Sequence, residues 1–468
     1  MTIMPEAQAI DKMLAMRFNV FFNRFKVNAI LRRVNANKEK GIPSKSILAF
    51  MLGLVFTQRN FYSLLHSARN TVSFSKDAVY RFLSRGHIHW EAFVRGLSCA
   101  VVGEVRKLTS EERRAAPILD DTPYYRDRSK KVELLSQCYD HSEKRFYKGF
   151  NLLNLAWSDG ATLVPVDFRL LASGGGDNLL EGSHVKEDGR TLATKRRTDA
   201  RTDKPTLALR MLEAAKGTAA QARYVLFDSW FASPKFLLCV KQLGYDVAAR
   251  LKNHENYRYL YNGQTLPISQ IYKANKKRRG RSRYLLSVTV QIRHNDFDVL
   301  APAKIVFVRD RGNRKNWIAL LSTDTALSED EIIALYGKRW DIETFHKTIK
   351  SCLCLAKEFQ MRSFDAIVAH TAVVLTRYIF LTLESRENRD MRSLGELFLA
   401  VCDELEDISF QYAFSLILSI LEYCMNEYLL LTSERIQGFV QHFIAELPRF
   451  IKDRLQFNVN RLSKKINN

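Results

Sequence analysis

The segment from residue 336 to residue 350 constrains the fold and the chemistry of this chain more than any other. It reads Tyr-Gly-Lys-Arg-Trp-Asp-Ile-Glu-Thr-Phe-His-Lys-Thr-Ile-Lys. Polar side chains recur in it every three or four residues, at Tyr336, Arg339, Glu343, Lys347 and Lys350. On one α-helix, with about 100° between successive residues, these five side chains share a face. The apolar Ile342, Phe345 and Ile349 occupy a different face, which can pack on a core.

The polar face of this predicted helix holds one carboxylate among three cations and a phenol. Such a face repels itself unless an anion lies against it and the carboxylate serves another purpose, such as holding a divalent metal. A solvated helix with incidental charge pairing is the ordinary alternative. It explains the face poorly, because the three cations accompany one acid and not several.

Composition indicates a polyanionic partner. The 468 residues carry a formal net charge of +22, and 46% of them are hydrophobic, which is enough for a large folded core. The simplest polyanion is nucleic acid. The sequence shows no signal peptide and no lipidation motif, and His370 and Arg377 interrupt its longest apolar run, residues 366–383. We therefore expect a buried helix there, no membrane association and a cytoplasmic location, in which the seven scattered cysteines stay reduced.

The pattern along the chain predicts helical ends around an α/β centre. Residues 1–113 show helical spacing, and a short basic helix at 78–84 suits DNA docking, although ordinary helical packing explains it equally well. Strands and helices alternate over 114–254 and again over 313–385, whereas 255–312 alternates with the period of a β-strand. Residues 386–468 are helical and rich in apolar side chains.

A basic segment interrupts the β-rich stretch. Residues 273–283 hold seven basic residues in eleven and no acid. We expect a hairpin tip that touches a phosphate backbone through Lys276, Lys277, Arg278 and Arg279. A solubilising loop is the alternative.

Three carboxylates stand where an α/β core could bring them together. Asp120 follows the apolar strand predicted at 116–119, Asp228 follows the buried strand predicted at 224–227, and Glu343 lies on the polar helix face. Two-metal phosphoryl transfer needs about this number of carboxylates from separate elements. Each alone fits a capping or surface acid, but their joint placement favours a metal site.

These motifs together resemble the insertion-sequence-4-like group of bacterial DDE transposases. The resemblance rests on Asp-Asp-Thr at 120–122, Leu-Phe-Asp-Ser-Trp-Phe at 226–231, and the Tyr-Arg-Glu-Lys signature at Tyr336, Arg339, Glu343 and Lys350. It implies a ribonuclease-H-like catalytic core, interrupted by the β-rich insertion at 255–312 and flanked by the helical ends. The core would hold two Mg²⁺ or Mn²⁺ ions on Asp120, Asp228 and Glu343.

The resemblance also implies a reaction and partners. Related enzymes cut transposon ends at terminal inverted repeats, pass through a terminal hairpin and join the ends to target DNA. Tyr336, Arg339, Lys347 and Lys350 would contact DNA, and Trp317 resembles by position the tryptophan that holds a flipped base, although a core tryptophan on a strand fits as well. A homodimer in the DNA complex, joined through residues 386–468, would act near the bacterial nucleoid.

Some alternatives stay open at this stage. The pattern Asp-x-Thr selects Asp120 over Asp121, which would point to the opposite face if the strand continued. A ribonuclease-H-like structure-specific endonuclease or resolvase would share the carboxylates but need neither the Tyr-Arg-Glu-Lys face nor the insertion. A non-catalytic DNA-binding protein derived from a transposase is the third class, and the presence of all three carboxylates argues against it.

Overall fold

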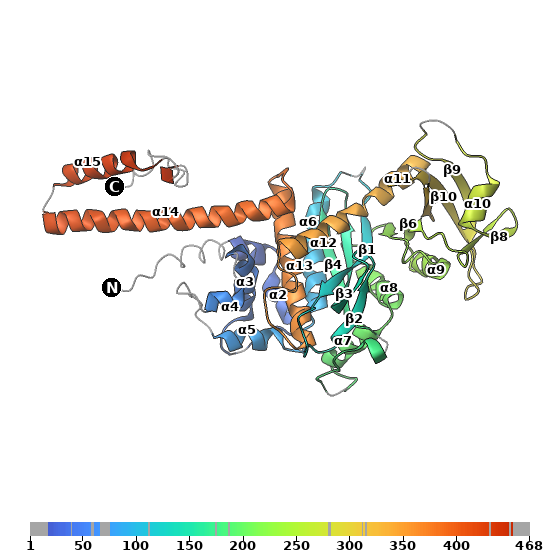
Figure 1. Ribbon diagram of the computed structural model, residues 1–468, viewed down its shortest axis with the longest axis horizontal. Coiled ribbons are helices and arrows are strands. Elements are labelled where there is room, and N and C mark those ends of the chain that lie inside the picture. Colours follow the sequence, from blue (N-terminus) through green and yellow to red (C-terminus); the bar gives the residue numbers. More distant parts are fainter. Residues whose placement is uncertain are drawn as a thin grey trace.

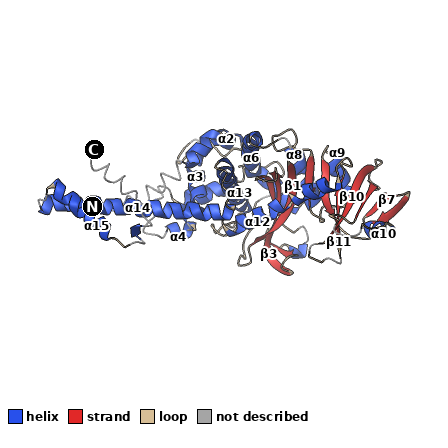
Figure 2. Ribbon diagram, turned by 90° about the horizontal axis from the view of Figure 1, so that it is seen from above, coloured by secondary structure: helices blue, strands red, loops and turns tan. Residues whose placement is uncertain are grey.

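The structure is a computed structural model. It describes residues 17–38, 40–57, 60–65, 75–110, 113–173, 176–185, 188–278, 282–310, 312–313, 316–429, 432–448 and 451–452. It is a mixed α/β protein built on a large mixed sheet, with the sheet towards one end and helices towards the other (Figures 1 and 2).

The sheet contains eleven strands within the described residues. They run in the order β2-β3-β1-β5-β6-β11-β10-β9-β7-β8, and β4 pairs with β3 beside this path. Their bounds are β1 Ala116–Tyr125, β2 Ser136–Asp140, β3 Arg145–Ser158, β4 Leu163–Leu171, β5 Tyr224–Phe227, β6 Asp246–Leu251, β7 Arg258–Tyr261, β8 Gln264–Pro267, β9 Leu286–Ile292, β10 Ala301–Arg309 and β11 Trp317–Ser322. The pairs β1–β5 and β5–β6 are parallel, and the other strand pairs are antiparallel.

The strands around β1 are buried on both faces, as their sequences suggest. Every residue of β5 is buried, and β4 is buried apart from a partly exposed Arg169, so both strands read as nearly continuous apolar runs. Strand β9 instead alternates buried and more exposed residues, as expected for a sheet with one face exposed to solvent.

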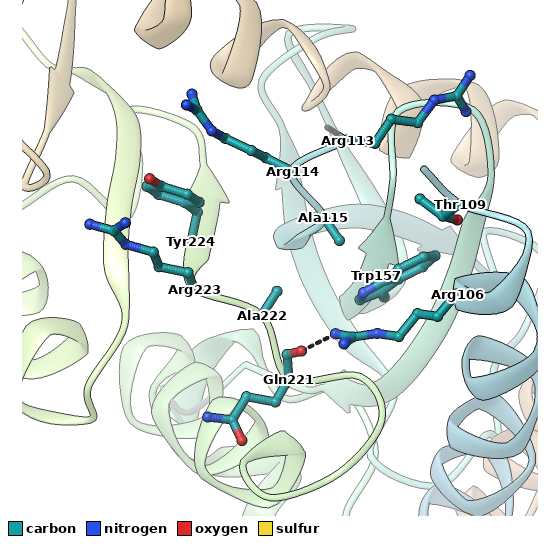
Figure 3. Close-up of a pocket in the computed structure, with 10 residues that line it drawn as sticks. All are labelled: Arg106, Thr109, Arg113, Arg114, Ala115, Trp157, Gln221, Ala222, Arg223 and Tyr224. Carbon is teal, nitrogen blue, oxygen red and sulfur yellow. Dashed lines mark hydrogen bonds between the residues drawn. The ribbon is translucent and has the colours of Figure 1, made fainter. Parts of the chain in front are cut away.

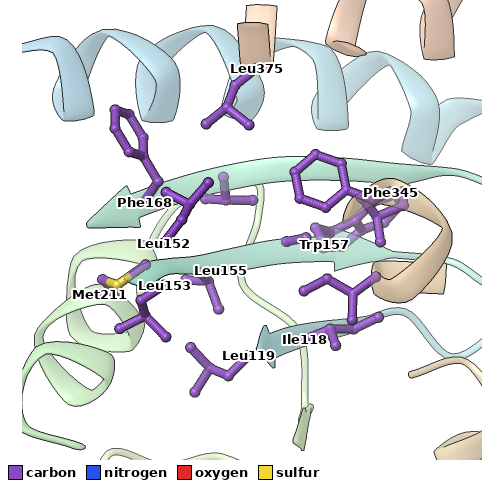
Figure 4. Packing of buried hydrophobic residues seen from close by; sticks show 14 of the residues in the cluster. Ile118, Leu119, Leu152, Leu153, Leu155, Trp157, Phe168, Met211, Phe345 and Leu375 are labelled. Atoms are coloured by element: carbon purple, nitrogen blue, oxygen red, sulfur yellow. The ribbon is translucent and has the colours of Figure 1, made fainter. Parts of the chain in front are cut away.

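Helices cover both faces of this sheet. Leu375 from α13 (Phe364–Glu387) and Phe345 from α12 (Trp340–Ser351) pack with strand residues such as Phe168, while Met211 from α8 (Lys204–Ala215) packs against Leu153 on the other side (Figure 4). Further helices are α9 (Pro234–Gln242), α10 (Ile268–Ala274) and α11 (Glu329–Gly337). The three-layer arrangement leaves the strand ends free to present polar side chains.

The N-terminal helices pack directly on this core. They are α2 Val27–Arg33, α3 Ser44–Leu54, α4 Phe61–Leu65, α5 Lys76–Leu83 and α6 Trp90–Lys107, with a 3₁₀ turn η1 at Val55–Thr57. Helix α6 lies against β4 and α13. In the described part of the chain, α13 alone has the length and hydropathy to cross a membrane, and that window is wholly buried in the protein.

A buried ion network joins the N-terminal helices to the core. Arg196 of α7 (Leu192–Arg201) bonds Glu91 of α6 at 3.1 Å and also pairs with Asp365 of α13. Its neighbour Arg197 bonds Asp365 at 2.8 Å and Glu133 at 2.7 Å. The arginines of α7 are therefore fixed by three acids, and a short 3₁₀ turn, η2 at Gly176–Asn178, precedes this helix in the chain.

The structure differs from the sequence-based expectation in three local features. Strand β1 continues past Asp120 to Tyr125, because β3 pairs with it along its whole length. The single helix expected over 336–350 is two, α11 and α12, with a turn at Lys338 and Arg339 between them. Residues 273–274 end α10 and residues 275–278 follow it, so the described part of the basic segment follows a helix and not a strand, as the tip of a hairpin would.

Residues 255–312 contribute β7 to β10 and α10, and these strands continue the same sheet. Strand β10 pairs with β11, and β11 pairs with β6 of the central part. The sheet is therefore continuous from the carboxylate-bearing strands to this β-rich end.

The C-terminal helices form an arm that projects from the body (Figure 1). Helix α14 (Leu394–Leu429) has 36 residues, and α15 (Ser433–Glu446) lies back along it. A small apolar cluster, separate from the main core, joins α14 to α15. It is centred on Leu418, Met425, Ile436 and Val440.

Candidate active site

Asp120 and Asp228 lie side by side on two parallel strands. Leu119 of β1 is in register with Phe227 of β5, so the next residue of each chain is an aspartate at the same level. Asp228 stands just beyond the end of β5, where its carboxylate accepts a hydrogen bond from the backbone N–H of Trp230 at 3.0 Å. This pair comes directly from β-sheet register.

Asp120 and Asp228 lie in an environment that is largely shielded from solvent and rich in negative charge. The pKa of Asp120 is raised to about 7, mainly by burial; the neighbouring charges of Asp121 and Asp228 act in the same direction, and Arg339 opposes them. Burial also raises the pKa of Asp228, with Asp121 acting in the same direction and Arg339 and Lys204 against it. The strand ends therefore concentrate negative charge that the protein's own cations do not fully offset.

Arg339 connects this pair to the third predicted carboxylate. Its guanidinium lies 3.4 Å from Asp120 Oδ2 and donates to Glu343 Oε1 on the first turn of α12. The same group lies 5.8 Å from the ring centre of Tyr336 at the end of α11. The turn between the two helices places Arg339 between Asp120 and Glu343, so Asp120, Asp228, Glu343, Arg339 and Tyr336 gather in one place.

The two predicted lysines of α12 lie farther along the helix. Lys347 is exposed, and Lys350 is partly buried, with its Nζ 5.5 Å from the ring centre of Tyr125. Burial lowers the pKa of Lys350, and Asp140 and Glu143 oppose that shift. Both lysines continue the line of charge that begins at Arg339.

The remaining predicted DNA contacts lie in the β-rich end. Trp317 begins β11, where its ring stacks on Tyr272 with centroids 4.8 Å apart and meets the edge of Phe307 at 5.0 Å. Lys276 is exposed; the Lys277 ammonium lies 4.6 Å from the Tyr272 ring and the Arg278 guanidinium 4.2 Å from that of Tyr284. Arg279 falls outside the described residues. Of these side chains, those that the structure describes have no bond to Asp120, Asp228 or Glu343.

The carboxylates suit a hard divalent cation in their chemistry, because Mg²⁺ and Mn²⁺ prefer oxygen ligands. The raised pKa values of Asp120 and Asp228 also indicate a place short of positive charge. The described residues contain no group of three or more His, Cys, Asp or Glu side chains close enough to hold a metal ion. In this arrangement Arg339 lies between two of the candidate ligands, so a metal held by all three would need that guanidinium to move.

Two side chains near the site were not singled out from the sequence. Lys204, at the start of α8, bonds Asp121 Oδ2 at 2.8 Å and places its ammonium 4.0 Å from the ring centre of Trp230. The Trp230 side chain is 45% exposed although it stands two residues after Asp228. The signal was available, since a tryptophan in a turn directly after a strand-end acid has little core to join. Lys204 could not be found from spacing.

The alternation of β1 separates Asp120 from Asp121. Asp121 faces Lys204 of α8, whereas Asp120 faces Arg339 at the start of α12. Beside Asp120, the facing residue Asn154 of β3 lies 3.1 Å from Nε2 of the buried His346. Burial lowers the pKa of His346 to about 3, so it adds no positive charge near the carboxylates.

Comparison with known proteins assigns the chain to a family. The family described as DDE superfamily endonuclease matches residues 40–311, more than half of the chain, and the chain belongs to that family. Among solved structures, it is similar to a piggyBac transposase in a synaptic complex with hairpin DNA, at 12% identity and a TM-score of 0.40, over 95% of this chain and 84% of that one. No curated protein matches it.

Proposed function

We propose that this protein is a DDE transposase of the insertion-sequence-4-like group, which cuts the ends of a mobile DNA element and joins them to target DNA. The observation that carries the proposal is the meeting of Asp120 and Asp228 on adjacent parallel strands, with Glu343 tied to them through Arg339. Membership of an endonuclease family supports the chemistry.

The strand order supports a ribonuclease-H-like core. The path β4-β3-β1-β5-β6 has two antiparallel pairs followed by two parallel pairs. A ribonuclease-H-like fold has this order, with its first acid on the central strand and its second on the neighbouring parallel strand. Residues 114–254 and 313–385 would form the core, 255–312 the insertion, and 1–113 a DNA-binding unit.

In the proposed reaction Asp120, Asp228 and Glu343 would hold two Mg²⁺ or Mn²⁺ ions. When bound, such ions activate the attacking oxygen and stabilise the leaving oxygen of the phosphodiester. Asp120 and Asp228 are held rigidly by sheet register, so they fix the position of the scissile phosphate. Glu343 lies on a helix that follows a turn, so it is the ligand whose position adjusts.

The chain's own cations would bind the DNA backbone. Arg339 Nε is buried and has no hydrogen-bond partner among the described residues, so a movement of the guanidinium towards the DNA would let it donate to a phosphate oxygen. Tyr336 lies beside it and restrains the guanidinium. Lys347 and Lys350 would contact successive phosphates along α12, and Lys276, Lys277, Arg278 and Arg279 would contact DNA away from the cut.

A terminal hairpin step is the finer part of the proposal, with Trp317 as the residue that would hold a flipped base. Its ring is packed between Tyr272 and Phe307, so base binding there would need this stack to open. Hairpin ends on the element after cleavage, detected on denaturing gels, would support this step. Open ends at every time point would contradict it.

The C-terminal arm would join two copies on DNA, because one reaction must cut two ends. Large apolar side chains stay exposed along it, at Ile417, Ile420, Tyr423, Phe439 and Phe443. Phe414 and Leu421 of α14 instead pack in the arm's own apolar cluster. Replacing Ile417 and Ile420 by Glu should halve the mass of the complex with end DNA. An unchanged mass would exclude this contact.

The test of function uses the full-length protein with linear DNA that carries the inverted repeats flanking its gene, together with a target plasmid and Mg²⁺. Asp228→Ala should abolish cleavage and strand joining while leaving end binding within about twofold. Asp188→Ala, which removes an exposed aspartate far from the site, is the matched control and should remain active. Cleavage without strand joining would favour the structure-specific endonuclease, and activity of Asp228→Ala would refute the site.

We also propose that the protein acts in the bacterial cytoplasm, in association with the nucleoid.

A further inference from the structure

A second polar pocket lies at the opposite end of the carboxylate-bearing strands. It has a volume of about 510 Å³ and opens where β1 and β5 begin, beside Ala115 and Ala222 (Figure 3). Along β5 it stands four residues before Asp228, or about 13 Å at the usual rise per residue. A group bound in it is therefore not the phosphate that the carboxylates would cut.

The lining of this pocket is rich in hydrogen-bond donors. Four arginines line it, Arg106, Arg113, Arg114 and Arg223, and among the described residues no acid does. Arg106 reaches across the pocket to donate to the backbone oxygen of Gln221 (Figure 3). A surface with so many guanidiniums in one concavity attracts an anion of more than one oxygen.

An unpartnered buried donor gives a second, independent sign of a ligand. Trp157 is fully buried, lines the pocket, and has an indole N–H with no partner among the described residues. Buried donors are normally bonded, because a donor that is removed from water and left unpaired destabilises the fold. The guanidinium of Arg106 lies 5.9 Å from the centre of the same ring.

The acids near the pocket leave part of this charge available. Arg114 pairs with Glu331 at 2.5 Å, and Arg223 pairs with Asp246 at 3.0 Å and with Asp324 at 2.7 Å. Arg106 and Arg113 have no ion pair with any described acid. The two arginines on the α6 side therefore carry the charge that an incoming anion would meet.

We propose that this pocket is a second phosphate-binding site, separate from the carboxylates. The phosphate is either a phosphodiester of nucleic acid or a free phosphate ion. Arg106 and Arg113 would contact its oxygens, and the Trp157 N–H would donate to one of them. The nucleic-acid source rests on the proposed function and is the one favoured by the net charge of +22.

The experiment compares two pairs of charge-removing variants in the full chain. The pocket pair is Arg106→Gln with Arg113→Gln. The control pair is Arg190→Gln with Arg210→Gln, which removes the same charge from two exposed arginines elsewhere. Binding to a 40-base-pair duplex is measured across salt concentrations, and the melting temperature is measured in sodium phosphate and in sodium chloride of equal ionic strength.

If nucleic acid is the source, the pocket pair should lower the slope of log affinity against log salt by up to about 2 and weaken binding up to about 30-fold at 0.15 M salt, from counterion release alone. The control pair should change neither by more than its general charge effect. If free phosphate is the source, phosphate should raise the melting temperature of the parent protein but not of the pocket pair, with equal DNA binding.

Equal behaviour of the two variant pairs in both measurements would overturn the proposal. Trp157→Phe, which removes the donor and keeps an aromatic ring, should lose the phosphate response in the same way, and the arginine pair stays decisive if that variant does not fold. Failure of the proposed function would appear separately, as a parent protein that binds DNA through this pocket but cuts none.

Discussion

Arg339→Ala tests whether the guanidinium and a metal ion serve the same carboxylates. The Arg339 side chain is only 16% exposed and lies 3.4 Å from Asp120, so their attraction at an effective dielectric constant near 20 is about 5 kcal/mol before the cost of burial. Breaking such a buried pair typically costs about 3–5 kcal/mol. Glu343 is 37% exposed, so its pairing adds at most about 1 kcal/mol. We expect a net loss of about 3 kcal/mol in the free energy of unfolding without metal.

Saturating Mg²⁺ should reduce this loss to about 1 kcal/mol, because the ion supplies the missing positive charge to the same oxygens. Urea unfolding of the parent and variant in EDTA and in 10 mM Mg²⁺ measures both values. Arg95→Ala is the matched control, since Arg95 pairs with the buried Asp167 away from the site and its loss should not respond to Mg²⁺. An Arg339→Ala loss that is the same in EDTA and Mg²⁺ would refute the reasoning.

Three further predictions concern stability and DNA contact. Burial alone would raise the pKa of Glu91, but Arg196 and His89 outweigh it and hold the pKa below its ordinary value of 4.5. This carboxylate therefore stabilises the fold above pH 4.5, and the contribution is lost as the pH falls. Stability should fall more steeply with decreasing pH in the parent protein than in Glu91→Gln, and parallel curves would contradict the assignment. Trp230→Ala should weaken binding of single-stranded ends by about 1–3 kcal/mol in a fluorescence titration if its exposed ring stacks on a base, whereas unchanged affinity would exclude that role. Leu375→Ala should lower the free energy of unfolding by about 2–5 kcal/mol in urea, and a loss below 1 kcal/mol would mean that α13 does not pack on the sheet as described.

The positions of strands could be predicted from the sequence, because apolar runs and the residues at strand ends give a local signal. The bounds expected for β5, residues 224–227, agree with the structure, and so the position of Asp228 just after β5 was available from the sequence. Asp120 was located for a partly wrong reason. We placed it at a strand end, but it lies within β1, and the partner strand β3 determines where β1 stops.

The contacts that depend on packing between distant elements were not readable. The spacing from Tyr336 to Lys350 suggested one helix, yet the chain turns at Arg339, which pairs with Asp120 more than two hundred residues away. Lys204 reaches Asp121 from the start of α8, a contact that no motif announces. The match over residues 40–311 shows the DDE superfamily endonuclease family. We propose the insertion-sequence-4-like group and the roles of individual side chains from the site.

The length of α14 turns a small change at its base into a large one at its tip. Thirty-six residues at 1.5 Å each make a rod of about 54 Å. A tilt of 10° at the short joint between α13 and α14 would carry the far end through about 9 Å at that rod length. Residues 388–393, which connect these two helices, therefore determine how accurately anything held at the tip is placed relative to the body.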